Sequence, residues 1–265
     1  HPDVMVWPEA AVPGYLRYDP ALQKLISGFA RQHHLWIVLG ADDAEPKAGN
    51  PNEADYFNSS FLIDPQGNLV DRYSKQRLVI FGEYIPLVRW LPFLKHLTTI
   101  DGGFTPGKGP VTFSLKNPDV RLSVLICFED VFGHGARTHA GQDVDFLLNL
   151  TNDGWFGEGA EQWQHAAIAV YRAVENGLPL VRCTNNGLTC WIDPVGRLLG
   201  VPEGDRSLVY RSGFHIVNLP VPVVSGQRQR TFYNRHGDVF GWVCVAVTAW
   251  AFAGWWRWRK ALKKS

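Results

Sequence analysis

Residues 121–130 read RLSVLICFED, and this stretch decides the fold class. Its first six residues are mostly apolar and alternate only weakly, as expected for a strand that is buried on both faces. The run stops at Cys127, and two carboxylates, Glu129 and Asp130, follow it. Sheets of α/β proteins place their functional groups at strand ends, so this stretch predicts such a sheet with a site at the end of the strand.

The rest of the chain alternates short apolar runs with longer helical stretches. The pattern predicts strands at 4–7, 35–40, 144–150 and 180–184, and helices at 20–33 and 161–176. Two hairpins are predicted as well, one joining residues 59–63 to 69–73 and one turning at 193–196, because Pro and Gly supply the turn dihedrals. This alternation predicts one α/β domain.

Length and composition limit the classes of function. The chain has 265 residues, 46% of them hydrophobic, which suffices for one large domain with a full core. A net charge of +1 gives no sign of a positively charged surface for nucleic acid, so we expect no nucleic acid partner. The cysteines show no CxxC spacing and no HExxH motif is present, so we expect free thiols and no metal site; the cysteines are Cys127, Cys183, Cys190 and Cys244.

The longest apolar stretch lies near the C-terminus. Residues 239–256 read VFGWVCVAVTAWAFAGWW and carry no charge, and at helical rise they cover roughly 27 Å, close to the hydrocarbon core of a bilayer. The following RWRKALKKS is strongly basic, and tryptophans gather at the boundary as in an interfacial belt. The pattern predicts a membrane span, with a buried core helix as the alternative because the span is short.

Three groups suited to covalent catalysis lie at or just beyond the ends of predicted strands. Glu9 follows the strand 4–7, Lys75 follows the first hairpin, and Cys127 follows the strand quoted above. A cysteine attacks an acyl carbon as its thiolate, so it needs a base for its proton and a donor for the developing oxyanion. Each residue also has an ordinary explanation, as an inert buried thiol, a surface carboxylate or a solvated lysine. Spacing alone does not decide between these readings.

The sequences around these residues closely resemble the motifs of the nitrilase superfamily and, within it, of the apolipoprotein N-acyltransferase family. Trp7-Pro8-Glu9 is similar to the glutamate motif, residues 73–79 with 81–83 to the lysine motif, and residues 127–130 to the nucleophile motif. Further segments match in the same order, at 104–107, 151–156, 172–177, 184–187 and 231–238. The resemblance covers nearly the whole chain.

This resemblance implies an α/β fold of the nitrilase-like αββα sandwich type, followed by one C-terminal transmembrane helix. It implies Cys127 as nucleophile, Glu9 as base and Lys75 as oxyanion partner, without a cofactor. The implied reaction moves a fatty acyl chain from a phospholipid, through a thioester on Cys127, to the N-terminal amine of the S-diacylglyceryl-cysteine of apolipoproteins. The implied partners are the phospholipid, the apolipoprotein and the membrane.

Other residues receive roles from the same resemblance. Glu83 and Glu129 are candidate supporting carboxylates near Lys75 and Cys127, with ordinary salt-bridge partners as the alternative. Trp155 and Phe156 are candidates for lining an acyl groove, although aromatic residues after a strand more often belong to the core.

The chain then divides into three parts. We expect a catalytic domain at 1–235, a transmembrane helix at 236–258 and a basic tail at 259–265. The positive-inside tendency puts the tail in the cytoplasm and the domain on the periplasmic face of the bacterial inner membrane. Upstream arginines reduce the charge asymmetry behind this orientation; they are Arg228, Arg230 and Arg235.

The chain also departs from the family pattern. It begins at His1 without the family's N-terminal membrane helices and first strand, which we expect to lie upstream. Ile80 replaces the usual proline of the lysine motif, and Phe128 stands where a tyrosine is often found.

Two other functions use the same residues. One is a nitrilase-type amidase that hydrolyses small amides, which the C-terminal span disfavours because such enzymes are soluble. The other is a membrane-anchored binding module without activity, which the intact set of Glu9, Lys75 and Cys127 disfavours.

Overall fold

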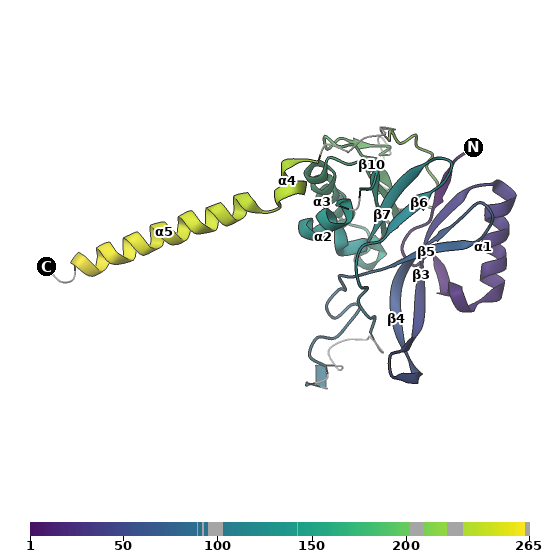
Figure 1. Cartoon of the computed structure of the whole chain (residues 1–265), viewed down its shortest axis with the longest axis horizontal. Coiled ribbons are helices and arrows are strands. Elements are labelled where there is room, and N and C mark those ends of the chain that lie inside the picture. Colours follow the sequence, from purple (N-terminus) through teal and green to yellow (C-terminus); the bar gives the residue numbers. More distant parts are fainter. Residues whose placement is uncertain are drawn as a thin grey trace.

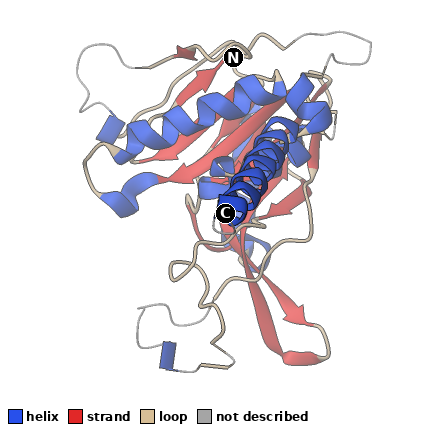
Figure 2. Ribbon diagram, turned by 90° about the vertical axis from the view of Figure 1, so that its left-hand side faces the viewer, coloured by secondary structure: helices blue, strands red, loops and turns tan. Residues whose placement is uncertain are grey.

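The structure is a computed structural model that describes residues 1–88, 90, 91, 93, 94, 103–141, 143–201, 209–221 and 230–262. Two sheets lie face to face with helices on their outer faces, and one long helix projects away from these layers (Figures 1 and 2). The expected αββα sandwich is confirmed. Arg228 and the last residues of the expected basic tail, 263–265, lie outside the described residues.

The first sheet comes from the N-terminal part of the chain. Its strands are β1 (Val4–Val6), β2 (Val12–Tyr15), β3 (Trp36–Lys47), β4 (Asn50–Ile63) and β5 (Leu69–Ser74). They run in the order β1-β3-β4-β5, and β2 also pairs with β3. β1 is parallel to β3, whereas β4 is antiparallel to both of its neighbours. The short turn Leu16–Tyr18 leads from β2 towards the outer helix.

Helix α1 (Pro20–His33) covers the outer face of this sheet. It begins where the Asp19 carboxylate accepts bonds from two backbone N–H groups of the first turn, and it ends at His34, whose φ is 50°. Its buried residues Ile26 and Ala30 join the outward-facing side chains of β3 and β4 in one apolar cluster.

The second sheet follows in the order β11-β10-β9-β8-β7-β6. Its strands are β6 (Thr112–Leu115), β7 (Val120–Ile126), β8 (Phe146–Asn152), β9 (Leu180–Asn185), β10 (Cys190–Ile192) and β11 (Leu198–Leu199). β7, β8 and β9 are parallel, so their carboxyl ends meet at one edge. Two 3₁₀ turns, η3 (Cys127–Val131) and η4 (Asp153–Phe156), begin at that edge. Helices α2 (Gly133–Ala140) and α3 (Glu161–Asn176) cover the outer face.

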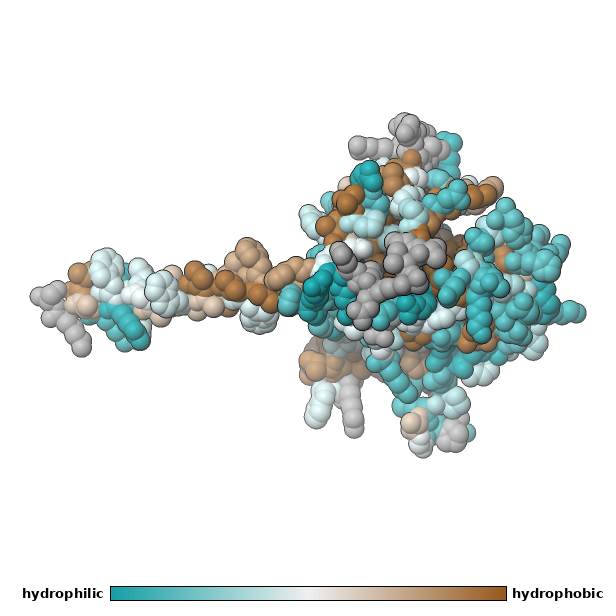
Figure 3. Space-filling view, turned by 45° about the horizontal axis from the view of Figure 1, so that its top comes forward, coloured by the Kyte–Doolittle hydropathy of each residue, from teal (hydrophilic) through white to brown (hydrophobic). Residues whose placement is uncertain are grey.

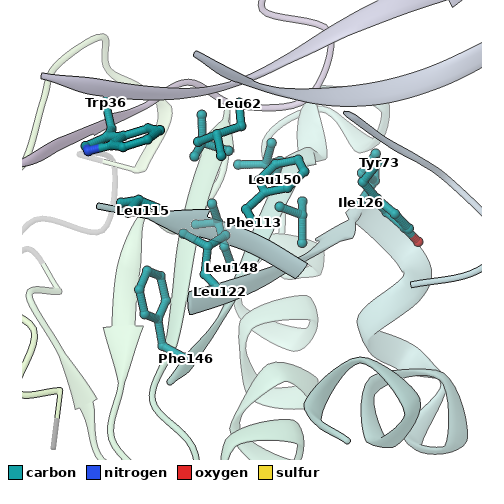
Figure 4. Close-up of a cluster of buried hydrophobic side chains, with 12 residues drawn as sticks. Trp36, Leu62, Tyr73, Phe113, Leu115, Leu122, Ile126, Phe146, Leu148 and Leu150 are labelled. Carbon is teal, nitrogen blue, oxygen red and sulfur yellow. The ribbon is translucent and has the colours of Figure 1, made fainter. Parts of the chain in front are cut away.

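The main core lies between the two sheets (Figure 4). Successive side chains of a strand point to opposite faces, so Leu122, Val124 and Ile126 of β7 meet Trp36 and other side chains of the first sheet. The cluster thus joins side chains of both sheets in one core.

Some expected boundaries were wrong. β3 and β4 extend as a ladder through residues 43–55, which are mostly polar, because the hairpin continues beyond the sandwich and buries little there (Figure 2). β8 begins at Phe146 rather than at residue 144 and continues to Asn152. β2 and β6 were not predicted, because β2 contains Pro13 and Gly14, which are depleted in strands, and β6 reads TFSL, which is half polar.

The C-terminal segment forms a short helix, α4 (Phe232–His236), and a long one, α5 (Val239–Leu262). α5 is long and apolar enough to cross a membrane, and none of its most apolar 18-residue window is buried against the domain. Against the described residues, α5 is therefore not the buried core helix of the alternative prediction. Hydrophobic side chains cover the part of α5 next to the domain (Figure 3). At the far end of α5, Arg259 lies over the ring of Trp255 and Lys260 lies over the ring of Trp256.

Candidate active site

Glu9 lies just after β1 in a close contact between two backbone segments. A Cβ at Gly40 of β3 would lie 2.5 Å from the Pro8 carbonyl oxygen, so only glycine allows this approach. The Glu9 side chain is buried, and its Oε1 accepts a bond of 2.7 Å from the Asn58 amide. Its Oε2 accepts a bond of 2.9 Å from the backbone N–H of Asn152, at the end of β8. Glu9 is therefore held by strands of both sheets.

Lys75 directly follows β5 and is almost completely buried. Its Nζ lies 2.7 Å from Glu83 Oε1 and 3.3 Å from Glu9 Oε1. Burial alone would lower the pKa of Lys75, but the charges of Glu9, Cys127 and Glu83 outweigh it and raise that pKa above its ordinary value. Lys75 is thus a buried ammonium group between two carboxylates.

Cys127 is the first residue of η3, at the end of β7. Its φ is 50°, a left-handed conformation that is uncommon for a residue with a side chain and that recurs at functional sites. Asn149 of β8 donates a bond of 3.0 Å to the Cys127 carbonyl oxygen. Burial raises the pKa of the Cys127 thiol to about 12 and Glu9 adds to this rise, while Lys75 and a hydrogen bond with Thr151 oppose it. The charges of Glu9 and Lys75 thus act on one thiol.

Glu83 lies beside Lys75, as expected for a supporting carboxylate. Its Oε1 accepts bonds from Lys75 and from the Asn58 amide, and its Oε2 accepts a bond of 2.8 Å from the Val79 backbone N–H. Asn58 therefore bridges Glu83 and Glu9, and the two carboxylates are fixed on either side of the Lys75 ammonium.

Glu129 lies near Lys75 and Cys127, as expected, but it is not an ordinary salt-bridge partner. It forms no salt bridge with the described residues, and its carboxylate instead accepts bonds from Ile126 N, Gln76 N and the Tyr73 hydroxyl, each 2.7 or 2.8 Å long. Burial raises the pKa of Glu129, and the backbone bonds oppose this rise. Glu129 thus connects the end of β5, which precedes Lys75, to the end of β7, which precedes Cys127.

Behind Cys127 lies a second buried ionic cluster, which the sequence did not predict. His165 bonds Asp153 through Nδ1 at 2.8 Å and Asp130 through Nε2 at 2.9 Å. Arg182 donates to Asp130 at 2.8 Å and lies 3.5 Å from Asp153. Burial lowers the pKa of His165, but its bonds to the two carboxylates outweigh it and raise that pKa to about 9.

This second cluster contacts the nucleophile turn from two sides. Asn149, which holds the Cys127 carbonyl, accepts a bond of 3.2 Å from Arg182, and the Thr151 hydroxyl donates to Asp153 at 2.9 Å. The donor atoms of Asp153, Glu161 and His165 also lie within 4.8 Å of one another, as a cation site would require. The positive charges of Arg182 and His165 already lie against these carboxylates, so we assign no ion there.

Trp155 and Phe156 lie on η4, just after Asn152. Their exposed fractions are 82% and 63%, so the interpretation that they belong to the core is wrong. They follow Asn152, whose backbone N–H bonds Glu9, by three and four residues in the chain. All four cysteines are free thiols, as expected.

Comparison with known proteins agrees with this geometry. The chain is 38% identical to the apolipoprotein N-acyltransferase of Geobacter metallireducens over 247 residues, which cover 93% of this chain and 44% of that protein. It is 31% identical to the protein of the same name from Chlorobaculum tepidum over 265 residues, which cover 92% of this chain and 48% of that protein. The chain thus spans less than half the length of these relatives.

Among solved structures, the fold matches an amidase from Nesterenkonia sp. AN1 with a TM-score of 0.55 and 21% identity, over 76% of this chain and 75% of that one. That structure carries acrylamide added to its active-site cysteine. At this identity the likeness concerns the fold alone.

A carbon–nitrogen hydrolase family model matches residues 2–211, which include Glu9, Lys75 and Cys127. With the sandwich and the buried groups at its strand ends, this match shows that the chain belongs to the carbon–nitrogen hydrolase family.

Proposed function

We propose that this chain is the catalytic part of an apolipoprotein N-acyltransferase of the bacterial inner membrane, with its domain on the periplasmic face. One observation carries the proposal: a buried lysine is paired with two carboxylates, and one of these, Glu9, acts electrostatically on the Cys127 thiol. The names of the relatives support the acyl transfer, and the exposed apolar helix α5 supports a membrane setting.

In the first half-reaction Cys127 attacks the ester carbonyl of a phospholipid. Because its pKa is about 12, the resting group is a thiol, and its proton passes to Glu9 as the S–C bond forms. The C–O bond of the ester then breaks, and Glu9 returns the proton to the oxygen of the departing lysophospholipid. The product is a thioester on Cys127.

In the second half-reaction the amine of the S-diacylglyceryl-cysteine attacks this thioester. Glu9 accepts a proton from the amine as the N–C bond forms, and the C–S bond breaks as sulfur takes a proton back. The acyl chain ends on the acceptor nitrogen, so the kinetics are ping-pong.

Lys75 stabilises the oxyanion of both tetrahedral intermediates. An ammonium group has three N–H donors, and Glu9 and Glu83 use two of them, which leaves a third for the substrate oxygen. The two carboxylates also keep Lys75 protonated when it is buried. Glu83 thus supports the reaction without touching the substrate, and Trp155 and Phe156 are positioned to contact acyl chains.

The test is to incubate the chain in phospholipid bilayers and to look for a hydroxylamine-sensitive acyl adduct by mass spectrometry. We expect the adduct on Cys127, and its loss in Cys127→Ser. Cys183→Ser is the matched control, because burial also raises the pKa of Cys183 to about 12 while no role is assigned to it.

Two outcomes would contradict the proposal. An adduct that is equal in Cys127→Ser and wild type would exclude Cys127 as the acyl carrier. Turnover of small amides without acylation by lipid would instead favour a nitrilase-type amidase.

A further inference from the structure

The segment just before the candidate membrane helix has no part in the proposed chemistry. Residues 231–238 read TFYNRHGD and form α4, which packs on α3. Helix α5 begins at Val239, and only Gly237 and Asp238 separate it from the end of α4 (Figure 1). The position of α4 therefore determines where α5 leaves the domain.

α4 is bound to the end of α3 by buried polar contacts. The Thr231 hydroxyl donates to the Glu175 carbonyl oxygen, and the Asn234 amide donates a bond of 2.8 Å to the Asn176 side chain. Asn234 and Asn176 are both buried, with exposed fractions of 4% and 0%. Buried amides that pair in this way are costly to separate, because each would lose its partner without gaining water.

Helix α2 holds α4 from a second direction. The Arg137 guanidinium donates to the carbonyl oxygens of Asn234 at 2.9 Å and Arg235 at 3.0 Å. A Cβ at Gly133, the first residue of α2, would lie 2.8 Å from the Tyr233 hydroxyl, so α2 and the Tyr233 side chain of α4 pack closely there. α4 is thus fixed between two helices of the catalytic domain.

The same end of α3 also holds the turn that carries Cys127. Arg172 donates from one nitrogen to the carbonyl oxygens of Asp130 at 2.9 Å and Val131 at 3.0 Å, both in η3. Its other nitrogens bond the Glu175 carboxylate, and its own carbonyl accepts a bond of 2.9 Å from Asn176. Residues 172–176 therefore contact the nucleophile turn on one side and α4 on the other.

The connection from α4 to α5 has little freedom. Gly237 adopts a φ of 66°, and its N–H donates a bond of 2.7 Å to the Tyr233 carbonyl. The next residue, Asp238, already accepts the first backbone bond of α5, from Trp242 N at 3.0 Å. A rotation of α5 would therefore be transmitted to α4 and to the end of α3.

We propose that Asn234 and Arg172 are positioning residues that hold the Cys127 turn at a fixed place relative to α5, and thus relative to the lipid surface that α5 enters. The inference rests on the proposed function. Neither residue needs to touch a substrate. Their effect is to present Cys127 to lipids in a bilayer. They should have little effect on the acylation rate when lipid reaches Cys127 from detergent micelles.

The test compares Asn234→Ala with wild type in two lipid preparations, phospholipid bilayers and detergent micelles that contain the same phospholipid. We expect the rate of Cys127 acylation to fall about tenfold in bilayers, because a misplaced nucleophile loses alignment, and to stay within about twofold in micelles. Phe232→Ala is the matched control on the same helix, because that ring is exposed and contacts only His236 among the ring pairs of the described residues.

A second variant guards against a general folding defect. Two glycines inserted after Gly237 lengthen the connection and leave every contact of α4 in place, and we expect the same loss in bilayers alone. Arg172→Lys keeps the charge but not the forked donor, so its bilayer rate should lie between those of wild type and Asn234→Ala. Equal losses in both preparations, or no loss in bilayers, would overturn the inference.

A separate measurement distinguishes failure of the inference from failure of the proposed function. Two rates are measured: the reaction of Cys127 with a lipid-anchored maleimide in bilayers, and its reaction with soluble N-ethylmaleimide. Neither reaction requires acyl transfer. We expect Asn234→Ala to lower the first rate relative to the second. If wild-type Cys127 takes no acyl group from lipid, the proposed function fails. Independently, an equal ratio of the two maleimide rates in Asn234→Ala and wild type would overturn the positioning role.

Discussion

Two buried ionic clusters meet at Cys127, and they differ in charge balance. On the side of the first sheet, a single ammonium group, that of Lys75, faces two carboxylates, Glu9 and Glu83. On the side of the second sheet, two carboxylates, Asp130 and Asp153, face two cations, Arg182 and the protonated His165. The first cluster thus has surplus negative charge, whereas the two cations of the second balance Asp130 and Asp153, with Glu161 at its edge, 3.9 Å from His165.

In the proposed mechanism, this difference separates a reactive cluster from a structural one. Surplus negative charge beside a thiol favours proton acceptance, and Lys75 retains a donor for a substrate oxygen. In the second cluster every carboxylate oxygen of Asp130 and Asp153 already has a partner, from His165, Arg182 or Thr151. We therefore expect changes in the first cluster to affect rate and changes in the second to affect stability.

The largest effect is expected from Glu9→Gln. The amide cannot take the Cys127 proton, so the acylation rate should fall by about 10²- to 10⁴-fold while the thermal midpoint changes little. Glu45→Gln is a matched control, because Glu45 also pairs with cations of the first sheet, Arg17 and Arg72, but lies away from Cys127. A rate within threefold of wild type would remove Glu9 from the mechanism.

Asp130→Asn should affect stability most. The change leaves Arg182 and His165 buried with one carboxylate fewer, and the free energy of unfolding should fall by about 3–5 kcal/mol. Denaturant unfolding measures it, with Glu53→Gln as the control for an exposed ion pair that should show no measurable change. Equal stability of the two variants would show that the second cluster is not structural.

The pH dependence of stability should also reflect the second cluster. The pKa of His165 is raised to about 9, so its contribution is complete below the unfolded value near 6.5 and is lost as pH rises through 9, by about 3 kcal/mol in all. Thermal midpoints between pH 6.5 and 9 should fall in wild type, and this slope should flatten in His165→Gln. The same slope in both proteins would assign the loss to another group.

On the acid side the sign is opposite. Burial lowers the pKa of His139 to about 4, so the folded state keeps it neutral while the unfolded state charges it below about 6.5. Stability should therefore decrease as pH falls from 6.5 to 4, and the two histidines together place the most stable pH near 6.5.

The smallest effect on stability is expected from Trp155→Ala. The ring is 82% exposed, so the free energy of unfolding should change by no more than about 0.5 kcal/mol. If the ring contacts acyl chains, the KM for phospholipid should rise while kcat changes little. An unchanged KM would remove Trp155 from the substrate-binding surface.

The sequence predicted most of the sandwich because its buried strands are apolar and its helices are amphipathic. It missed the outer part of the β3–β4 hairpin, since residues 43–55 bury little and show no apolar alternation. Glu9, Lys75 and Cys127 could be brought together only through the family resemblance, because their contacts depend on how two sheets dock.

The second ionic cluster was missed for a related reason. Asp130, Asp153, His165 and Arg182 come from four elements of the fold and share no local spacing. A charged residue in the middle of the predicted strand 180–184 was the available signal. Arg182 is fully buried there, and a buried arginine requires partners.

The bond between the Asn152 backbone and Glu9 joins positions that are 143 residues apart in the chain. During synthesis Glu9 leaves the ribosome early and β8 leaves it much later. Contacts between residues so far apart in the chain form slowly. Before β8 joins its sheet, Glu9 lacks its bond from the Asn152 N–H and is held from the first sheet alone. The contacts of Glu9 are therefore complete only after both sheets have formed and docked.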